Sequence, residues 1–420
     1  MGFAQGVSAL NASAANLDVI GNNIANAGTI GFKSGGVQFA DVYAGSKIGL
    51  GTQVASVAQN FTSGSVQTSS RALDVAISSG DGFFRLASPE GEIAYSRNGQ
   101  FDMDKNGYIV NTGGLQLTGY AVGANGNLAG GTPAPLQMPT AAMAPQATGT
   151  ATGITAQFNL DSRSTAPVAA FDATDSSTYN YANSVTIYDS LGNPHELATF
   201  FAKQAAPVNT WNVHATVDGK PLDNGGVLPA VANGTAIGSL TFDSNGILDT
   251  AIVGNGVLGF KTPGFTLGNG SAPMAFDMNV AGTTQFGNAN DVRKLTQDGY
   301  ASGTLTSLAI EPDGTITGKY SNEQSNTLGQ IVLSSFVNPN GLQSKGDNVW
   351  AETAASGQPL TGTPGAGTKL GALVAGALEG SNVDLTSELV NLIIAQRTYQ
   401  ANAQTVKTQD QVMQTLMNMR

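Results

Sequence analysis

The stretch of sequence that decides the fold lies near the carboxyl end, where residues 382–403 read NVDLTSELVNLIIAQRTYQANA. From Leu385 onward, mostly apolar residues recur in alternating steps of four and three, which places them in one narrow stripe on a helix. No glycine or proline lies between 381 and 420, and Ser381 or Asp384 can cap the helix by accepting a backbone N–H. The spacing therefore predicts a long terminal helix. Its stripe comprises Leu385, Leu389, Leu392, Gln396, Tyr399, Ala403, Val406, Asp410, Met413 and Met417.

The amino end has the same pattern. Residues 3–27 read FAQGVSALNASAANLDVIGNNIANA, and Gly28 follows as a helix stop. The stripe of this second helix comprises Phe3, Val7, Leu10, Ala14, Leu17 and Ile24. A single stripe would fit a helix docked on a domain, whereas matching stripes at opposite ends favour pairing. We therefore expect the two ends to pair with each other or with other copies of the chain.

The sequence between the two ends is typical of a β protein. Its 54 Gly and 16 Pro interrupt regular structure often. Residues 305–310 and 315–318 flank Asp313-Gly314 and are clear examples of strands around a tight hairpin turn. The predicted fold class is mainly β, with an outer β-rich domain inserted in an inner one. Both are expected on an α-helical coiled-coil stem formed by the N- and C-terminal segments.

Glycine- and proline-rich breaks, such as residues 130–153, suggest where the domains meet. Insertion of one domain into a surface loop of another is structurally well tolerated, which fits this nested arrangement. The predicted boundaries are terminal helices at 1–30 and 381–420, an extended linker region at 31–70 and 356–380, β domain 1 at 71–145 and 286–355, and β domain 2 at 146–285.

The composition excludes several function classes. The net charge is −11, from 18 Lys+Arg and 29 Asp+Glu, which argues against nucleic-acid binding because such proteins need a basic face. The absence of cysteine and the presence of only two histidines exclude zinc-thiolate and histidine-rich metal sites. There is no run of about 20 apolar residues, so no membrane insertion is expected. A cleaved signal peptide is also missing, which leaves either a cytoplasmic location or export by another route.

Two short motifs resemble binding sites without meeting their requirements. Residues 254–259 match G-x-G-x-x-G, but Pro263 follows where a dinucleotide site needs a helix. The stretch that begins with Asp102 and Asp104 opens like a calcium loop, yet Gly113 stands where the loop needs a glutamate. A hairpin turn is expected there instead, and a weak calcium contact is left open.

The histidines do not form a recognisable catalytic arrangement. His195 and Glu196 follow a proline and could serve as acid and base, but an exposed turn histidine is the favoured interpretation. His214 lies in an alternating strand and is expected on one side of it. We therefore predict no catalytic, cofactor-binding or metal-binding residues, no cofactor and no enzymatic activity.

Both terminal runs resemble the two signature ends of the bacterial flagellar rod, hook and hook-associated protein family. The runs are residues 10–33 and 382–403, and residues 73–77 and 95–101 are similar to the β domain that the family shares. The length and the extra inserted domain favour the hook member of the family. The residues that carry the terminal motifs are Asn16, Leu17, Asn22, Asn23, Asn26, Gly31, Phe32, Arg397, Tyr399 and Asn402.

The resemblance implies a structural subunit that polymerises with itself into the curved tubular hook, the flexible universal joint that transmits motor torque from rod to filament. It also implies type III flagellar export, an extracellular location, and contacts with the hook cap protein, the distal rod protein and the first hook-associated protein. A distal rod or hook-associated protein, or a secreted β-rich adhesin, are the alternatives. The expected assembly residues are Phe3, Val7, Leu10, Leu17, Ile24, Leu385, Leu389, Leu392, Tyr399, Val406 and Met413.

The ends are too poor in apolar anchors to be stable alone. Ordering each residue costs about 1–2 kcal/mol, and burying each large apolar anchor returns about 1.5–3 kcal/mol. About ten anchors cannot order some sixty terminal residues on these terms. We therefore expect both ends to be disordered in the free subunit and to fold only in the polymer.

Overall fold

The computed structural model describes residues 3–42, 51–78, 80–123, 126–222, 235–249, 259–261, 264–365 and 369–418. The chain divides into two compact units. Unit 1 comprises residues 1–140, 305–319 and 325–420, and unit 2 comprises residues 141–304 and 320–324. Unit 2 therefore interrupts unit 1 in the sequence. Strands fill both units and the described residues begin and end in a helix, which confirms the predicted fold class.

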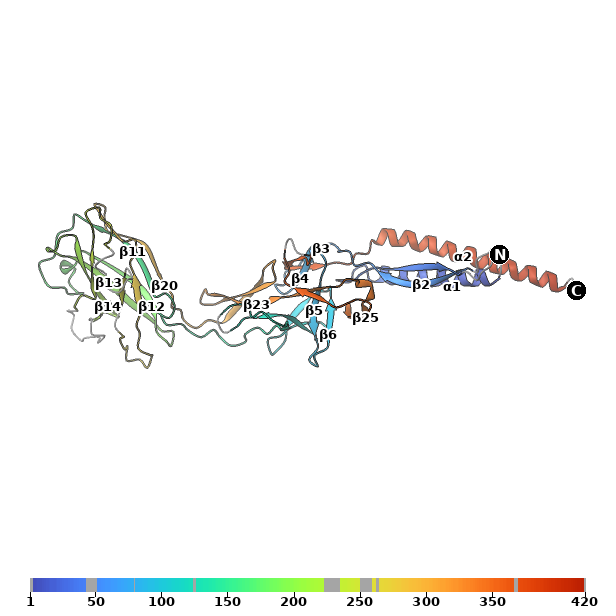
Figure 1. The fold of residues 1–420 in the computed structure, drawn as a ribbon, viewed down its shortest axis with the longest axis horizontal. Helices are drawn as coiled ribbons and strands as arrows, with labels where there is room; N and C mark the ends of the chain where they lie inside the picture. Colours follow the sequence, from blue (N-terminus) through green and yellow to red (C-terminus); the bar gives the residue numbers. More distant parts are fainter. Residues whose placement is uncertain are drawn as a thin grey trace. The chain divides into compact units, whose positions relative to one another are not determined.

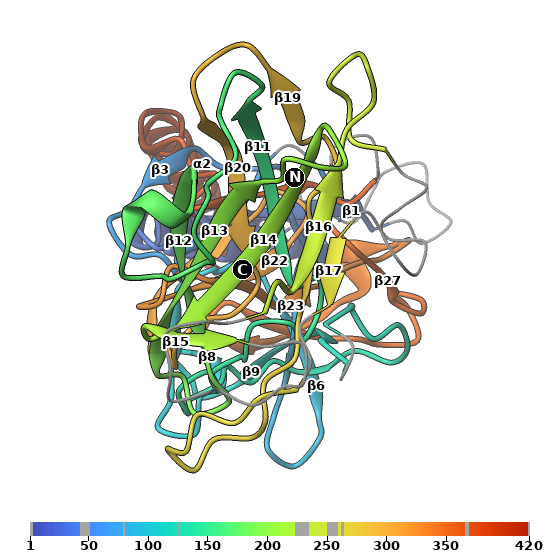
Figure 2. The same ribbon diagram turned by 90° about the vertical axis from the view of Figure 1, so that its left-hand side faces the viewer.

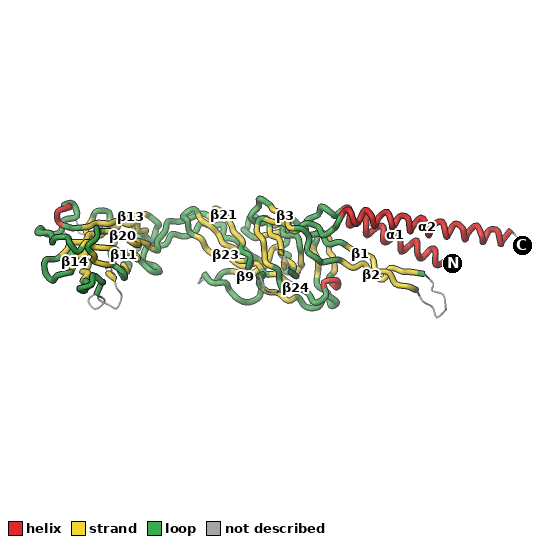
Figure 3. The backbone as a smooth tube through the Cα atoms, turned by 90° about the horizontal axis from the view of Figure 1, so that it is seen from above, coloured by secondary structure: helices red, strands yellow, loops and turns green. Residues whose placement is uncertain are grey.

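Two antiparallel helices, α1 (Phe3–Ala25) and α2 (Leu385–Asn418), lie side by side in unit 1 (Figures 1 and 3). The start of α1 meets α2 near Val406, and the end of α1 meets Glu388 at the start of α2. Asp384 caps α2, since its Oδ1 accepts hydrogen bonds from two backbone N–H groups of the first turn, at 2.9 and 3.3 Å. The second helix thus begins where the sequence predicts.

A β hairpin lies beside α1 in unit 1 (Figure 3). Its strands β1 (Gly35–Asp41) and β2 (Thr52–Gln59) pair antiparallel. Two further antiparallel pairs join distant segments, β3 (Val66–Thr68) with β29 (Ala377–Glu379) and β4 (Val75–Ser78) with β28 (Ala372–Ala375). Both segments predicted as extended linkers therefore contain paired strands. The strands of three or four residues could not be predicted from the sequence, because they are too short to show an alternating period.

The largest sheet of unit 1 has 13 strands, with the main path β21-β22-β23-β9-β5-β6-β26-β25. The turn at Asp313 joins β21 to β22, which are neighbours in the sheet as the sequence predicts. The core of unit 1 includes Phe84, Leu86 and Phe101, each at most 1% exposed. The remaining elements of the unit are β5 (Phe83–Ala87), β6 (Ile93–Ser96), β7 (Phe101–Met103), β8 (Ile109–Asn111), β9 (Gln116–Ala121), β10 (Ala134–Pro135), β21 (Leu305–Ile310), β22 (Thr315–Tyr320), β23 (Ser325–Ile331), β24 (Leu333–Ser335), the 3-10 turn Pro339–Gly341, β25 (Gln343–Gly346), β26 (Val349–Ala351) and β27 (Leu360–Gly362).

Unit 2 contains two five-stranded sheets that share one apolar core. Figure 2 shows β12, β13 and β14 side by side in one of them. Phe158 of the other sheet belongs to the same buried cluster as Trp211, whose Nε1 donates a hydrogen bond to Gln285 Oε1 at 2.7 Å. One sheet holds β12 (Tyr181–Tyr188), β13 (Pro194–Lys203), β14 (Thr210–Val217), β15 (Lys220–Leu222) and β16 (Gly238–Thr241), and the other holds β11 (Ile154–Asp161), β17 (Gly259–Lys261), β18 (Asp277–Asn279), β19 (Thr284–Phe286) and β20 (Asp291–Gln297), with the 3-10 turn Ser176–Thr178 outside both.

The predicted inserted domain, residues 146–285, lies inside unit 2. Strand β20 continues the unit beyond that range, because it pairs antiparallel with β11. Asp298, which directly follows β20, links this end of the unit to the loop that precedes β11. Its carboxylate accepts backbone N–H groups between Gly149 and Gly153, at 2.8 to 3.0 Å. The division into four predicted segments stays a prediction.

His195 is not the exposed turn residue that the sequence predicts. Its side chain is 12% exposed, with Nδ1 2.7 Å from Asp218 Oδ2 and Nε2 3.4 Å from Asp189 Oδ2. Burial acts to lower the pKa of His195, but hydrogen bonds and charges from the two aspartates outweigh it and raise the pKa. The expectation was wrong because His195 lies in β13, and Asp218, 23 residues away in the turn after β14, reaches its ring. His214 is also buried and stacks on Phe171 at 4.0 Å.

The two rejected motifs have different outcomes. Asp104 Oδ1 accepts the backbone N–H groups of Asn106 and Tyr108 at 2.9 and 2.8 Å, while Asp102 pairs with Arg71. The contacts of Asp104 form the turn of the β7–β8 hairpin, as expected. Residues 254–258 of the glycine-rich motif lie outside the described residues.

Candidate assembly surface

Small side chains bring α1 and α2 together. A Cβ added to Gly6 would lie 2.7 Å from Val406 Cγ2, so only glycine permits this approach without a shift. Ala12 and Ile20 of α1 and Ala395 of α2 are buried, with 4–6% exposure. Close helix packing through small residues leaves little apolar area covered in the pair itself. Most large apolar residues of α2 therefore stay exposed in the single chain.

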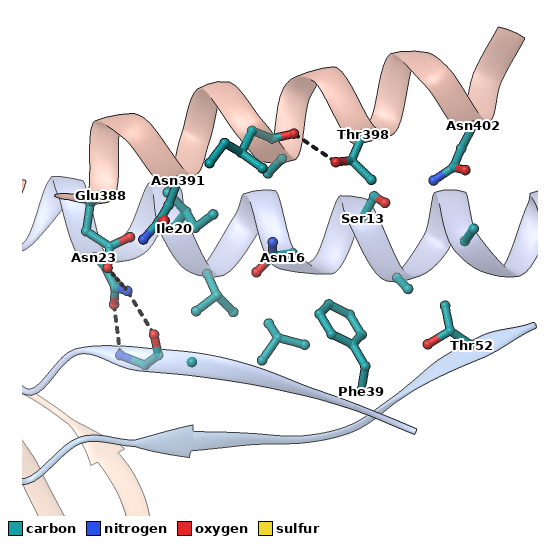
Figure 4. Close-up of a pocket in the computed structure, with 18 residues that line it drawn as sticks. Ser13, Asn16, Ile20, Asn23, Phe39, Thr52, Glu388, Asn391, Thr398 and Asn402 are labelled. Atoms are coloured by element: carbon teal, nitrogen blue, oxygen red, sulfur yellow. Dashed lines mark hydrogen bonds between the residues drawn. The ribbon is translucent and has the colours of Figure 1, made fainter. Parts of the chain in front are cut away.

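Asn23 ties the end of α1 to two other elements (Figure 4). Its Nδ2 donates to Gly35 O at 2.8 Å, and its Oδ1 accepts the Gly35 N–H at 2.9 Å, which fixes the start of β1. The same Nδ2 lies 3.4 Å from Glu388 Oε1 on α2. Asn23 is itself 2% exposed. This predicted motif residue thus holds the two helices and the hairpin in register.

A buried ion cluster of Lys33, Arg97 and Glu379 anchors the base of the helices in unit 1. Lys33 Nζ lies 2.7 Å from Glu379 Oε1, and Arg97 Nη1 lies 3.3 Å from Glu379 Oε2. All three side chains are at most 2% exposed. Burial lowers the pKa of Lys33 and of Arg97, while the charge of Glu379 opposes the shift in both.

Gly31 completes this anchor through its backbone. Its N–H donates to Glu379 O at 2.8 Å, and its φ is 71°. A Cβ there would lie 2.7 Å from the backbone nitrogen of Asn98, so neither the conformation nor the space suits another residue. The predicted motif residue Gly31 is therefore explained by the close crossing of the connector over the β domain.

A groove of about 580 Å³ runs between α1, α2 and the β1–β2 hairpin (Figure 4). Its walls mix amide and hydroxyl groups with apolar side chains such as Val19, Val37 and Phe39. The predicted motif residues Asn16, Asn23 and Asn402 line it. Such a mixed, open groove can accept a side-chain surface of another protein.

The predicted stripe of α2 coincides only in part with the face that meets α1, where its member Val406 lies against Gly6. Glu388, Ala395 and Asn402, spaced by seven, line the groove beside α1 and are half-buried or buried. This face is displaced by roughly a quarter turn from the predicted stripe. Within that stripe, Leu392 and Val406 are half-buried. Four of the predicted assembly residues, Leu385, Leu389, Tyr399 and Met413, are 40–59% exposed, and Met417 at the end of the stripe is 72% exposed.

The predicted assembly residues of α1 also differ in how exposed they are. Phe3 and Val7 are 55% and 36% exposed, while Leu10, Leu17 and Ile24 are half-buried. The structure therefore does not bring the two predicted stripes together as one seam within the chain. Contacts of these residues with other copies stay a prediction.

The other motif residues have local roles or none within the chain. Asn26 Nδ2 donates to Asn22 O at 3.0 Å and so closes the last turn of α1. The Phe32 N–H donates to Thr29 O at 3.3 Å in the connector that follows. Arg397 is exposed on α2 and takes part in none of the ion pairs of the described residues.

Sequence reasoning missed part of the exposed apolar surface. Val390, Ile393 and Ile394 are 50–57% exposed, although none belongs to the predicted stripe. The signal was present, because residues 389–394 are apolar at every position except one. A helix that is apolar around most of its circumference cannot cover all of it with a single partner helix.

The described residues contain neither a membrane-spanning helix nor a cluster of metal-ligating side chains. No helix there is long and apolar enough to span a membrane. No group of three or more His, Cys, Asp or Glu side chains in the same residues is placed to hold a metal ion.

Four family models match the chain, in an order that follows its elements. They describe a flagella basal body rod protein (residues 5–33), a flagellar hook protein FlgE/F/G D1 domain (76–155), a flagellar basal body protein FlaE D2 domain (159–300) and a flagellar basal body rod FlgEFG protein C-terminal region (374–419).

Relatives that match the whole chain are flagellar hook proteins. The flagellar hook protein FlgE of Salmonella typhimurium is 48% identical, and that of Escherichia coli K12 is 47% identical, each over 100% of both chains. The flagellar hook protein FlgE of Borreliella burgdorferi is 30% identical over 99% of this chain and 98% of its own. The crystal structure of Helicobacter pylori flagellar hook protein FlgE2 covers 75% of this chain and 99% of its own, with a TM-score of 0.51 at 14% identity, and shows likeness of fold alone.

Proposed function

The chain belongs to the family of bacterial flagellar hook proteins, and we propose that its two terminal helices form the surface through which it assembles. It is a structural subunit of the flagellar hook, as predicted, and it polymerises with itself in the flagellar axis. Full-length similarity to hook proteins does not favour the rod, hook-associated or adhesin alternatives. The structural role of the family also implies that the chain is not an enzyme.

The observation that supports this surface is the exposed apolar side of α2. Leu385, Leu389, Tyr399 and Met413 were expected there, and Val390 and Ile393 join them. Isolated exposed apolar residues are ordinary, whereas a row of them along one helix marks an interaction site. In a polymer, neighbouring copies would cover this row.

The free subunit has little to hold its helices in place. Ala12, Ile20 and Ala395 are the buried apolar residues of the described parts of α1 and α2. Helices in proteins owe most of their stability to an apolar face that is packed against something else. The terminal segments therefore become fully ordered only when other copies supply that contact.

Amide hydrogen exchange on the free and the polymerised protein tests this proposal. Residues 3–25 and 385–418 should exchange fast in the monomer and slowly in the tubes, while the strands of unit 1 stay protected in both. Slow exchange across both helices in the monomer would contradict the proposal.

The partners, the export route and the extracellular location of the subunit are inferred from the family and from the composition. At the ends of the tube, the subunit would meet the hook cap protein, the distal rod protein and the first hook-associated protein. It would leave the cell through the flagellar type III export apparatus without a cleaved signal, and a cysteine-free chain suits an extracellular location. Mass spectrometry of hooks sheared from cells should find the amino end intact, and a shortened amino end would contradict signal-independent export.

Unit 2 is proposed to set the curvature of the tube through contacts along its length. The neutral polar surface expected from a chain with 11% charged residues lets contacts exchange partners or bridge through water as subunits slide. Most of unit 2, residues 144–302, can be removed between two adjacent points, because the backbones of Met143 and Gly303 pair at 2.7 and 3.2 Å. Joining these two residues directly should give tubes that form but are straight. Tubes with unchanged curvature would refute the proposal.

A further inference from the structure

Glu388 is a carboxylate without an adequate partner in its own chain. Among the described residues, its Oε2 is buried and accepts no hydrogen bond. Its Oε1 has one long contact, 3.4 Å from Asn23 Nδ2. Figure 4 shows this side chain at one end of the groove, between α1 and α2. Leaving a charged acceptor unpaired is costly, and a cation from elsewhere would remove that cost.

The helices hold few cations that could serve. No Lys or Arg occurs in α1, and α2 carries Arg397 and Lys407. Arg397 is exposed and forms no ion pair within the described residues, and a planar guanidinium matches a carboxylate well. Nine residues separate Arg397 from Glu388, which on a helix is about 13.5 Å and half a turn. The Arg397 of one chain therefore cannot reach the Glu388 of the same chain.

Arg397 also lies among exposed apolar residues. Leu389, Val390, Ile393 and Arg397 occupy the side of α2 roughly opposite Glu388 and Ala395, and we call these four residues the back face. The three apolar members are 45–52% exposed. The back face thus combines apolar area with a single cation, and the groove combines apolar walls with a single unpaired carboxylate.

We propose that the back face of one copy docks at the Glu388 end of the groove of a second copy, with Arg397 paired to the second copy's Glu388. The inference rests on the proposed function and specifies how the assembly surface is used. The guanidinium would neutralise the carboxylate there.

The arrangement also accounts for an open polymer. The groove and the back face lie on opposite sides of one helix, so the contact joins unlike surfaces of successive copies. A contact of this kind generates a helical filament when its rotation does not close a ring, whereas a self-complementary contact stops at a dimer. All copies then run in the same direction. The register that brings Arg397 to Glu388 therefore also brings Gln400 to Asn391.

Cysteine cross-linking tests the geometry, because the natural chain contains no cysteine. The double variant Asn391→Cys/Gln400→Cys should give a ladder of disulfide-linked oligomers when its tubes are oxidised. Two cysteines nine residues apart on a helix exceed the roughly 7 Å Cα separation that a disulfide tolerates, so the link can form only between copies. In Gln400→Cys/Gln411→Cys both thiols lie on the back side of α2, and this matched control should give no ladder.

Charge removal tests the ion pair. Glu388→Gln and Arg397→Gln should each raise the critical concentration for tube formation by about tenfold. The double variant should be no worse than the more affected single variant, because the two groups act as one pair. Asp18→Asn, which removes an exposed carboxylate from α1, is the matched control and should leave the critical concentration unchanged.

The outcomes separate this inference from the function on which it rests. A ladder from the Asn391/Gln400 pair together with non-additive charge variants supports the contact. Normal tubes that give no ladder, or that respond to Asp18→Asn as strongly as to Glu388→Gln, would overturn the contact and leave the proposed function standing. Failure of the unaltered chain to form tubes would overturn the proposed function instead.

Discussion

Leu389→Asp offers a sharp separation between folding and assembly. Leu389 lies on the outer side of α2, is 45% exposed, and is not among the residues that line the groove beside α1. An exposed substitution away from caps and cores usually changes stability by less than about 1 kcal/mol. We therefore expect unit 1 and unit 2 to stay folded, with unchanged urea unfolding and unchanged near-ultraviolet circular dichroism.

Assembly should respond far more strongly than folding. Fully burying a leucine returns about 1.5–3 kcal/mol, so covering the 45% that is still exposed is worth about 0.7–1.3 kcal/mol. A carboxylate at the same place must lose water without a partner, which adds a penalty of several kcal/mol. The sum is at least about 3 kcal/mol for each subunit added, which raises the critical concentration more than about a hundredfold.

Light scattering and electron microscopy over a concentration series measure this threshold. Leu389→Met keeps an apolar side chain of similar size, so it should assemble near the threshold of the unaltered chain. If Leu389→Asp formed tubes at that same threshold, the exposed row on α2 could not be an assembly surface.

Three further predictions concern the contacts within each unit. Gly6→Val should separate the two helices, since even a Cβ there meets the opposite side chain at 2.7 Å, and faster amide exchange in residues 3–25 of the assembled tubes would show it. Glu379→Gln leaves Lys33 and Arg97 as buried cations without a carboxylate and should cost about 3–5 kcal/mol in urea unfolding of unit 1, with unit 2 unaffected; an unfolding midpoint like that of the unaltered chain would contradict it. His195 has a raised pKa, so the stability it contributes to unit 2 is complete below the unfolded pKa of about 6.5 and is lost as pH rises through the higher folded pKa. Unfolding of unit 2 measured from pH 6 to pH 9 should therefore show a decline that His195→Gln removes, and an equal decline in the variant would refute this.

Local sequence patterns were enough to predict the start of α2 and the turn between β21 and β22. The stripe from Leu385 onward and the cap at Asp384 predicted where α2 begins, and Asp313-Gly314 predicted a real turn between paired strands. Both are short-range signals, because spacing and capping depend on neighbours within a few residues.

Which face of α2 meets α1 could not be predicted. Residues 389–394 are apolar on nearly all sides, so the spacing alone does not select a face. The choice is made by Gly6, Ala12 and Ala395, whose small side chains let the two helices approach closely. Small residues carry no strong periodic signal, and this packing preference emerges only when both helices are present.

The partners of the buried charged side chains could not be predicted either. Glu379 meets Lys33 and Arg97 across separations of 346 and 282 residues, and His195 meets Asp218 from a different turn. Such partners are set by the sheet topology. A single sequence shows only that charged residues exist, so the buried cluster and the paired histidine could not be anticipated.

The most direct test of the account is to remove residues 385–418 and follow self-association by sedimentation and electron microscopy. We expect the shortened chain to remain monomeric at every concentration at which the full chain forms tubes, while both β units retain their native unfolding transitions. Tubes grown from the shortened chain would contradict the claim that the terminal helices carry assembly.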